Sequence, residues 1–148
     1  MTRSIHDNLL VSYQVECEAR TITLNTQHRS PEKTTEFTDV VFKGVEAYDF
    51  ENDAFGNVVF DLECVSVEQL LAERGAKVAE SYRVAGSPGP WAANLRTAPD
   101  ILNKKGVKGF ILSSSYGLSG WVLAQEVSIV PAQHVAPPDA ANSAARVS

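Results

Sequence analysis

Hydrophobic and polar residues alternate over much of this chain, in the pattern of β-strands that bury one face. Between residues 9 and 19 the odd positions hold Leu, Val, Tyr, Val, Cys and Ala, while Ser, Gln and Glu fill most even positions. A period of two predicts a strand there, because successive side chains of a strand point to opposite faces. A returning strand is predicted over residues 20–27, where Ile22 and Leu24 share one phase, and a turn over residues 28–33, which contain a Ser-Pro pair.

Two further extended regions follow this hairpin. Residues 35–42 predict a third strand, and residues 45–50 continue it beyond a bend or bulge at Gly44. The Gly, Asn and Asp residues within 51–57 predict a hairpin loop. Residues 58–64 alternate again and predict a fourth strand.

The hydrophobic period changes at Ser66, where Ser66-Val67-Glu68-Gln69 matches a helix capping box. A helix is predicted from there to Gly75, because glycine is typical of helix ends. Residues 76–84 predict a second helical piece. Residues 86–90, which alternate Gly and Pro with one Ser, predict a loop.

A short helix over residues 99–105 and strands over residues 110–115 and 120–130 complete the predicted elements. Together they predict an α+β fold, in which an antiparallel sheet of about six strands can curve strongly. Two or three short helices are inserted between strands four and five and pack on one face of the sheet. One domain is expected over residues 1–130, followed by a flexible tail over residues 131–148, where apolar bulk disappears.

The predicted core collects the apolar positions that share a phase. These are Val11, Tyr13, Val15, Cys17, Ile22, Leu24, Val41, Phe60, Leu62, Leu70, Leu71, Ile101, Leu102, Phe110, Leu112, Trp121 and Leu123.

Composition narrows the class of protein. With 148 residues, 44% of them hydrophobic and 21% charged, the chain is long enough to bury a core. Residues 1–8 lack the apolar run of a secretory signal, and no stretch reaches the roughly 18 apolar residues of a membrane span. A cytoplasmic protein without membrane contact is therefore expected. The net charge of −5 argues against binding nucleic acid through its phosphates.

The two cysteines, Cys17 and Cys64, are too few and too far apart for a disulfide framework or a zinc site. Each lies on the apolar phase of a predicted strand, so both are expected to be buried thiols. Neither has a nearby His or basic cluster that would activate it as a nucleophile.

Three residues offer weak candidates for ligand binding. His6 and Asp7 are the kind of pair that serves as a base or metal ligand, but neighbours on an extended chain point to opposite sides. Trp91 follows a Pro-Gly loop and is expected to be an exposed aromatic residue that contacts a ligand. These three residues are predicted as a ligand-binding set without catalytic roles.

Two patterns that resemble known motifs fail in their spacing. Asp49, Glu51 and Asp53 are spaced like calcium ligands, but Ala54 stands where such a loop needs Gly. The Ser- and Gly-rich residues 113–120 lack the Gly-x-Ser-x-Gly order of a nucleophile elbow. No catalytic residue, metal site or cofactor is predicted.

The distribution of charge suggests a partner more strongly than any motif does. Residues 36–63 hold eight acidic residues and one lysine, whereas residues 74–108 hold seven basic and two acidic residues. If the strands share a sheet, one exposed face is strongly acidic, and such a face can attract a basic partner protein. The alternative is ordinary solubilising charge. The residues predicted to bind the partner are Glu16, Glu18, Asp49, Glu51, Asp61 and Glu63.

Three segments carry a loose resemblance to known proteins. Residues 4–10 (SIHDNLL), residues 41–45 (VFKGV) and residues 114–124 (SSYGLSGWVLA) resemble a broad class of small, uncharacterised bacterial β-rich proteins. That class includes immunity proteins of bacterial toxin systems. The resemblance implies a β-rich fold and no catalytic residues.

These observations leave three functions open, with binding favoured over catalysis. The first is a non-catalytic binding protein, of the immunity-inhibitor type, that uses an acidic sheet face. The second is a small-molecule-binding protein or enzyme with a pocket between the sheet and the Trp91 loop. The third is a structural subunit that forms oligomers through exposed strand edges.

Overall fold

The computed structural model describes residues 5, 8–29, 35–51 and 57–132. These residues form strands joined by two α-helices and one 3-10 helix. In chain order the elements are β1 (Leu9–Glu16), β2 (Thr21–Arg29), β3 (Thr35–Lys43), β4 (Ala47–Glu51), β5 (Asn57–Val65), α1 (Val67–Ala85), η1 (Pro90–Ala93), α2 (Ala98–Lys104), β6 (Lys108–Tyr116), β7 (Ser119–Ala124) and β8 (Glu126–Pro131).

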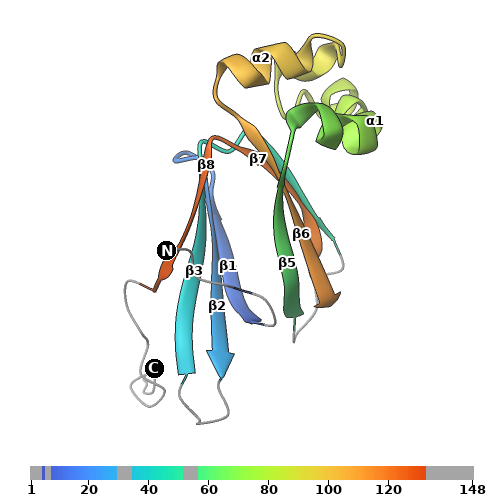
Figure 1. The fold of residues 1–148 in the computed structure, drawn as a ribbon. Helices are drawn as coiled ribbons and strands as arrows, with labels where there is room; N and C mark the ends of the chain where they lie inside the picture. Colours follow the sequence, from blue (N-terminus) through green and yellow to red (C-terminus); the bar gives the residue numbers. More distant parts are fainter. Residues whose placement is uncertain (1–4, 6–7, 30–34, 52–56, 133–148) are drawn as a thin grey trace, which may run out of the picture.

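The strands form one antiparallel sheet in the order β4-β7-β6-β5-β1-β2-β3-β8. Its central joint is narrow, because β1 and β5 pair only where Leu9 meets Val58 and Leu10 meets Asn57. We therefore distinguish a first half-sheet (β1, β2, β3 and β8) from a second half-sheet (β4, β5, β6 and β7). Figure 1 shows the two groups of strands, with α1 and α2 at one end of the molecule.

Two stretches of extended chain bend at one corner, and each stretch supplies one strand to each half-sheet. β3 leads into β4 through residues 44–46, and β7 leads into β8 through Gln125. Gly44 has a φ of 65°, a left-handed conformation that glycine adopts at low cost. The backbone N–H of Gln125 donates to the carbonyls of Lys43 and Gly44, at 3.0 and 3.2 Å. The corner lets β3 pair with β8 while β4 pairs with β7.

The predicted fold class is wrong, although the antiparallel β-sheet it contained is confirmed. The protein is mostly β with eight strands instead of about six, because the bends at Gly44 and Gln125 each divide one predicted extended region. The helices follow β5, the fifth strand, and lie at one end of the molecule (Figure 1). The first helix is also longer than predicted, with 19 residues.

Helix α1 begins where the capping box predicted but continues past its predicted end. The Ser66 hydroxyl accepts the backbone N–H of Gln69 at 3.0 Å, which satisfies one of the free amides of the first turn. Gly75 lies inside the helix and is buried, where an added Cβ would stand 3.0 Å from the Leu95 side chain. Gly86, with a φ of 74°, ends the helix instead. Gly75 is therefore a packing residue.

Two hydrophobic clusters stabilise the fold. The first lies between the half-sheets, and the second joins the second half-sheet to the helices. Predicted core residues confirmed as buried are Ile22, Leu24, Leu70, Leu71, Leu102, Phe110, Leu112, Trp121 and Leu123. Tyr13, Val15, Val41 and Leu62 are half-buried, and the side chain of Phe60 lies outside the described residues.

Several core predictions are wrong, each for a local reason. Val11 is 57% exposed, because the β1–β2 register shifts between Leu10 and Ser12 and turns Leu10 inward in its place. Ile101 faces outward from α2 and is 38% exposed. Both cysteines are also exposed.

Cys17 lies in the turn after β1, whereas the exposure of Cys64 follows from the narrow central joint. Cys64 pairs with the buried Phe110, so both side chains are on the same face of the second half-sheet. β5, however, has β1 beside it only at Asn57 and Val58, so Cys64 stands at an open margin. The alternation of β5 therefore predicted the correct face for Cys64. The side chain is exposed because no neighbouring strand covers that face at the edge of the half-sheet.

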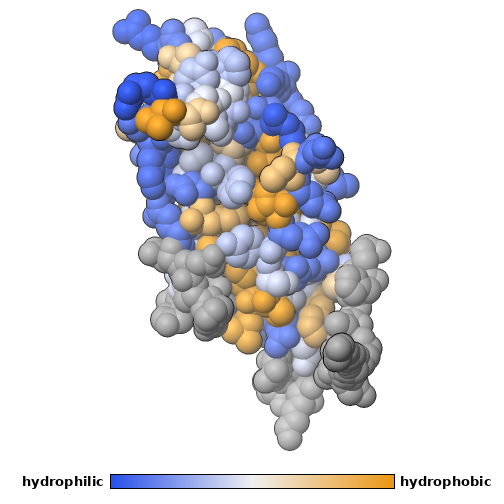
Figure 2. Space-filling model, turned by 180° about the vertical axis from the view of Figure 1, so that it is seen from behind, coloured by the Kyte–Doolittle hydropathy of each residue, from blue (hydrophilic) through white to orange (hydrophobic). Residues whose placement is uncertain are grey.

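Apolar residues also reach the surface of the molecule. Viewed from behind, apolar surface lies below the helical end, among hydrophilic residues (Figure 2). Exposed large apolar side chains include Leu9, Val11 and Tyr48. Among the described residues, none of the helices combines the length and the apolar character needed to cross a membrane.

Candidate functional site

A pocket of about 500 Å³ lies between the end of the β1–β2 hairpin, the start of β4 and helix α1. Apolar side chains from both half-sheets and from α1 line it, together with charged and hydroxyl groups. The apolar residues include Val15, Ile22, Val45, Ala47, Val78 and Trp121, and the polar ones include Glu16, Arg20, Asp49, Lys77, Ser81 and Ser87. Its volume falls within the range of ordinary ligand pockets, about 300–1,000 Å³.

Arg20 fixes the wall of the pocket that the β1–β2 hairpin forms. It has a φ of 53°, so the turn over residues 17–20 is tight enough to bring its backbone against the β3–β4 connection. The Val45 N–H donates to the Arg20 carbonyl at 3.0 Å, and the Arg20 guanidinium donates to the Val45 carbonyl at 3.0 Å. Arg20 therefore binds both backbone polar groups of Val45 and holds the hairpin end against the β3–β4 connection.

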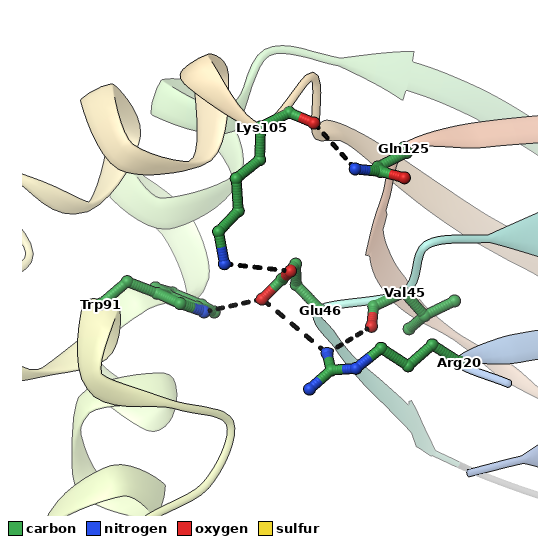
Figure 3. Close-up of polar contacts among 6 residues, drawn as sticks. All are labelled: Arg20, Val45, Glu46, Trp91, Lys105 and Gln125. Carbon is green, nitrogen blue, oxygen red and sulfur yellow. Dashed lines mark hydrogen bonds and ion pairs between the residues drawn. The ribbon is translucent and has the colours of Figure 1, made fainter. Parts of the chain in front are cut away.

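Glu46, next along the chain, gathers three partners from distant parts of the sequence (Figure 3). One carboxylate oxygen accepts the indole N–H of Trp91 at 3.1 Å and lies 3.9 Å from the Arg20 guanidinium. The other lies 3.3 Å from the Lys105 ammonium. The Glu46 side chain is only 15% exposed, so its charge is stabilised by these partners more than by water. The cluster ties η1 and the end of α2 to the corner of the sheet.

Lys77 of α1 closes the other side of the pocket against β4. Its ammonium contacts Asp49 at 3.2 Å and Glu51 at 2.6 Å. The hydrogen bond and positive charge of Lys77 lower the pKa of Glu51 below its ordinary value of 4.5. In turn, the hydrogen bonds to Glu51 and Asp49 raise the pKa of Lys77 above its ordinary value of 10.5. One lysine thus serves two carboxylates, and its positive charge balances only one of them.

The six acidic residues predicted to bind a partner do not form one continuous face. Asp49 and Glu63 share a face of the second half-sheet, because Glu63 pairs with Ile111, Ile111 with Trp121, and Trp121 with Asp49. Glu51 lies two residues after Asp49 on β4, and Asp61 lies two residues before Glu63 on β5, so both belong to that face as well. Lys77 binds the two acids of β4.

Glu16 and Glu18 lie apart from the other four acids, at the end of β1 and in the β1–β2 turn of the first half-sheet. Glu16 lines the pocket. Both side chains are exposed, and neither forms an ion pair within the described part of the chain. The role of all six acids in partner binding stays a prediction.

The structure does not bring together the three residues predicted as a weak ligand-binding set. Trp91, predicted to be exposed, is 5% exposed, because its ring packs in the cluster beneath the helices. Ser87 and Pro88, from the loop before it, line the pocket, but Trp91 does not. His6 and Asp7 lie outside the described residues.

Sequence reasoning missed the charged residues that shape the pocket. Arg20, Glu46, Lys77 and Lys105 stand in four different segments, and none belongs to a recognisable motif. Only Glu46 offered a weak signal of partial burial, because its carboxylate stands between the apolar residues Val45 and Ala47 in a short extended stretch. Their contacts depend on long-range folding, which no local pattern encodes.

Three carboxylates line the pocket, and two of them, Glu46 and Asp49, are engaged with cations. Over the described ranges, no three His, Cys, Asp or Glu side chains converge in a way that would hold a metal ion. Comparisons with protein-family models, curated proteins and solved structures found no match to this chain.

Proposed function

We propose that this protein is a binding protein whose ligand occupies the pocket between the β1–β2 hairpin, β4 and α1. The observation that carries the proposal is the pocket itself, a volume of about 500 Å³ with apolar side chains and a charged margin. Such a combination supports a ligand with an apolar body and polar groups that fix its orientation.

The contacts that join the surrounding walls support this proposal. The hairpin is bound to Val45, the helical end is bound to Glu46, and α1 is bound to Asp49 through Lys77. Each wall therefore contacts the segment from Val45 to Asp49 before a ligand arrives, which lowers the entropy cost of binding.

The first prediction concerns a side chain that would fill the pocket. Ser81 is an exposed residue of α1 that lines the pocket, so Ser81→Trp places an indole there without disturbing the core. We expect a library of small amphipathic fragments to shift the backbone amide NMR signals of Ala47 and Ser81 in the unmodified protein. The same fragments should lose this binding in Ser81→Trp.

Val84→Trp is the matched control, because Val84 is 68% exposed on the same helix and does not line the pocket. It should bind fragments as the unmodified protein does. If Ser81→Trp keeps the same shifts, or if no fragment shifts a pocket residue, the proposed function is wrong.

A further inference from the structure

The pocket follows the open edge of a strand. β4 is the first strand of the sheet order and pairs with β7 alone. Alternate peptide groups of such an edge strand point away from the neighbouring strand and stay available for hydrogen bonds. The pocket is lined by five consecutive residues that lead into and along β4: Val45, Glu46, Ala47, Tyr48 and Asp49.

Backbone hydrogen bonds close this edge at one end only. Both polar groups of the Val45 backbone are bound to Arg20. Beyond that point, in the part of the chain that the structure describes, Ala47–Glu51 forms no backbone hydrogen bond outside its ladder with β7. The hairpin end therefore marks where an added strand would stop, and the following residues offer a template for pairing.

The side chains around this edge suit a segment with alternating character. Tyr48, on the face of the first hydrophobic cluster, is 43% exposed because no strand lies beside β4 there. Val15 and Ile22 stand on the hairpin side of the pocket, and Val78 stands on the α1 side. A strand placed along β4 would set alternate side chains against these apolar groups.

The uncompensated charge of the pocket is negative. Arg20 contacts Glu46, and Lys77 contacts Asp49 and Glu51. Glu16 lines the pocket without an ion-pair partner among the described residues, and Glu18 follows it in the turn. A basic side chain of the ligand would find an exposed carboxylate at this margin.

We infer that the ligand is an extended peptide segment of a partner protein, carrying Lys or Arg, which pairs with β4 as an added strand. Addition of a strand to an open sheet edge is an established mode of peptide recognition, in which backbone hydrogen bonds supply affinity and side-chain pockets supply selectivity. The inference rests on the proposed function and narrows the class of ligand.

The experiment uses peptides selected from a random peptide display library against the full chain, with counter-selection against Ser81→Trp. The best peptide is then synthesised in two forms, N-methylated at alternate residues in one register or the other. A strand offers its N–H groups to a neighbour only at every second residue. One pattern should therefore weaken binding by about tenfold or more, since two or more hydrogen bonds are lost, and the other should leave it nearly unchanged.

A charge-reversal variant tests the basic character of the segment. Glu16→Lys should weaken binding of the selected peptide by about tenfold, and added salt should reduce this difference. Glu126→Lys is the control, because Glu126 is an exposed acid of β8 away from the pocket and should leave affinity unchanged. Equal affinity for Glu16→Lys and the unmodified chain would contradict a basic ligand.

The remaining outcomes separate this inference from the proposed function. Equal effects of the two N-methylation patterns, in either direction, contradict strand pairing. Fragment binding that Ser81→Trp abolishes, without any peptide selected, would keep the pocket as a binding site and overturn the peptide. A dimer in light scattering that Ser81→Trp converts to a monomer would identify a second copy of the chain as the occupant and would also overturn the inference.

Discussion

At the scale of single residues, Glu46 has the most consequential position in this protein. Its carboxylate joins the hairpin turn, η1 and α2 through Arg20, Trp91 and Lys105. A buried carboxylate is costly unless it is paired and hydrogen-bonded, so the three partners and the charge depend on one another. The residue stabilises the pocket's frame and is not free to react.

Replacing this carboxylate by an amide tests its role in stability. Glu46→Gln keeps the shape of the side chain but removes its charge, so the Arg20 and Lys105 contacts weaken. We expect the free energy of unfolding, measured by urea denaturation, to fall by about 1–3 kcal/mol. Glu80→Gln breaks an exposed pair with Arg83 on α1 and should cost less than about 1 kcal/mol. Equal losses for the two variants would show that the Glu46 cluster adds nothing beyond a surface pair.

At the scale of elements, the corner at Gly44 and Gln125 decides the shape of the sheet. A Cβ added to Gly44 would lie 2.4 Å from the Gln125 side chain, in addition to the strain of a φ of 65°. The Gln125 side-chain amide donates to the Lys105 carbonyl at 2.9 Å, so moving this side chain away from Gly44 would break that hydrogen bond. Gly44 and Gln125 therefore form the bend of the strands, and Gln125 also contacts the end of the helical region at Lys105.

Alanine substitution separates these two contributions. Gly44→Ala should lower the free energy of unfolding by more than Gly106→Ala does. Gly106 has a similar φ of 78°, but no atom lies within 4 Å of its added Cβ. Backbone strain alone costs about 1–2 kcal/mol, and the collision with Gln125 should add about 1 kcal/mol or more. Thermal or urea unfolding measures both, and adding Gln125→Ala to Gly44→Ala should recover the excess. Equal costs at the two glycines would contradict this view of the corner.

At the scale of the whole molecule, a helical cap is fixed to a bent sheet by apolar packing and by exposed ion pairs. Leu70, Leu102 and Trp121 supply the packing between the layers. Lys77 adds the contact between α1 and the acids of β4. The pocket exists because the cap, the hairpin end and the open edge of β4 approach one another without closing.

The Lys77 contact predicts a dependence of stability on pH. The pKa of Glu51 is lowered in the folded protein, so its contribution is present above the ordinary value of 4.5 and disappears as the pH falls through the lower, folded value. Lys77→Met should therefore reduce the free energy of unfolding at neutral pH and have no effect in strong acid. Since these groups are exposed, the difference should be small and should shrink in high salt.

Urea denaturation over a series of pH values measures this effect. Lys108→Met removes a lysine at the start of β6 that forms no ion pair among the described residues, so it serves as the control. A pH profile for Lys77→Met that parallels the unmodified profile through the acid range would contradict the assigned pairing.

What the sequence by itself determined was local. Alternation with a period of two located the strands, and Ser66 with Gln69 located the start of α1, because these signals depend on neighbouring residues and on the geometry of one element. The phases of Ile22, Leu24, Phe110 and Leu112 followed in the same way, since each lies in a regular ladder.

The tertiary structure alone decided which of the apolar positions located by alternation are buried by other elements. Cys64 had the apolar phase but lies at the margin of a half-sheet, and Val11 was turned outward by a register shift in β1. The pocket likewise joins β1, β4 and α1, which approach one another only after the sheet bends at Gly44. Burial and the grouping of charges depend on contacts between residues far apart in the chain, and no period in the sequence records them.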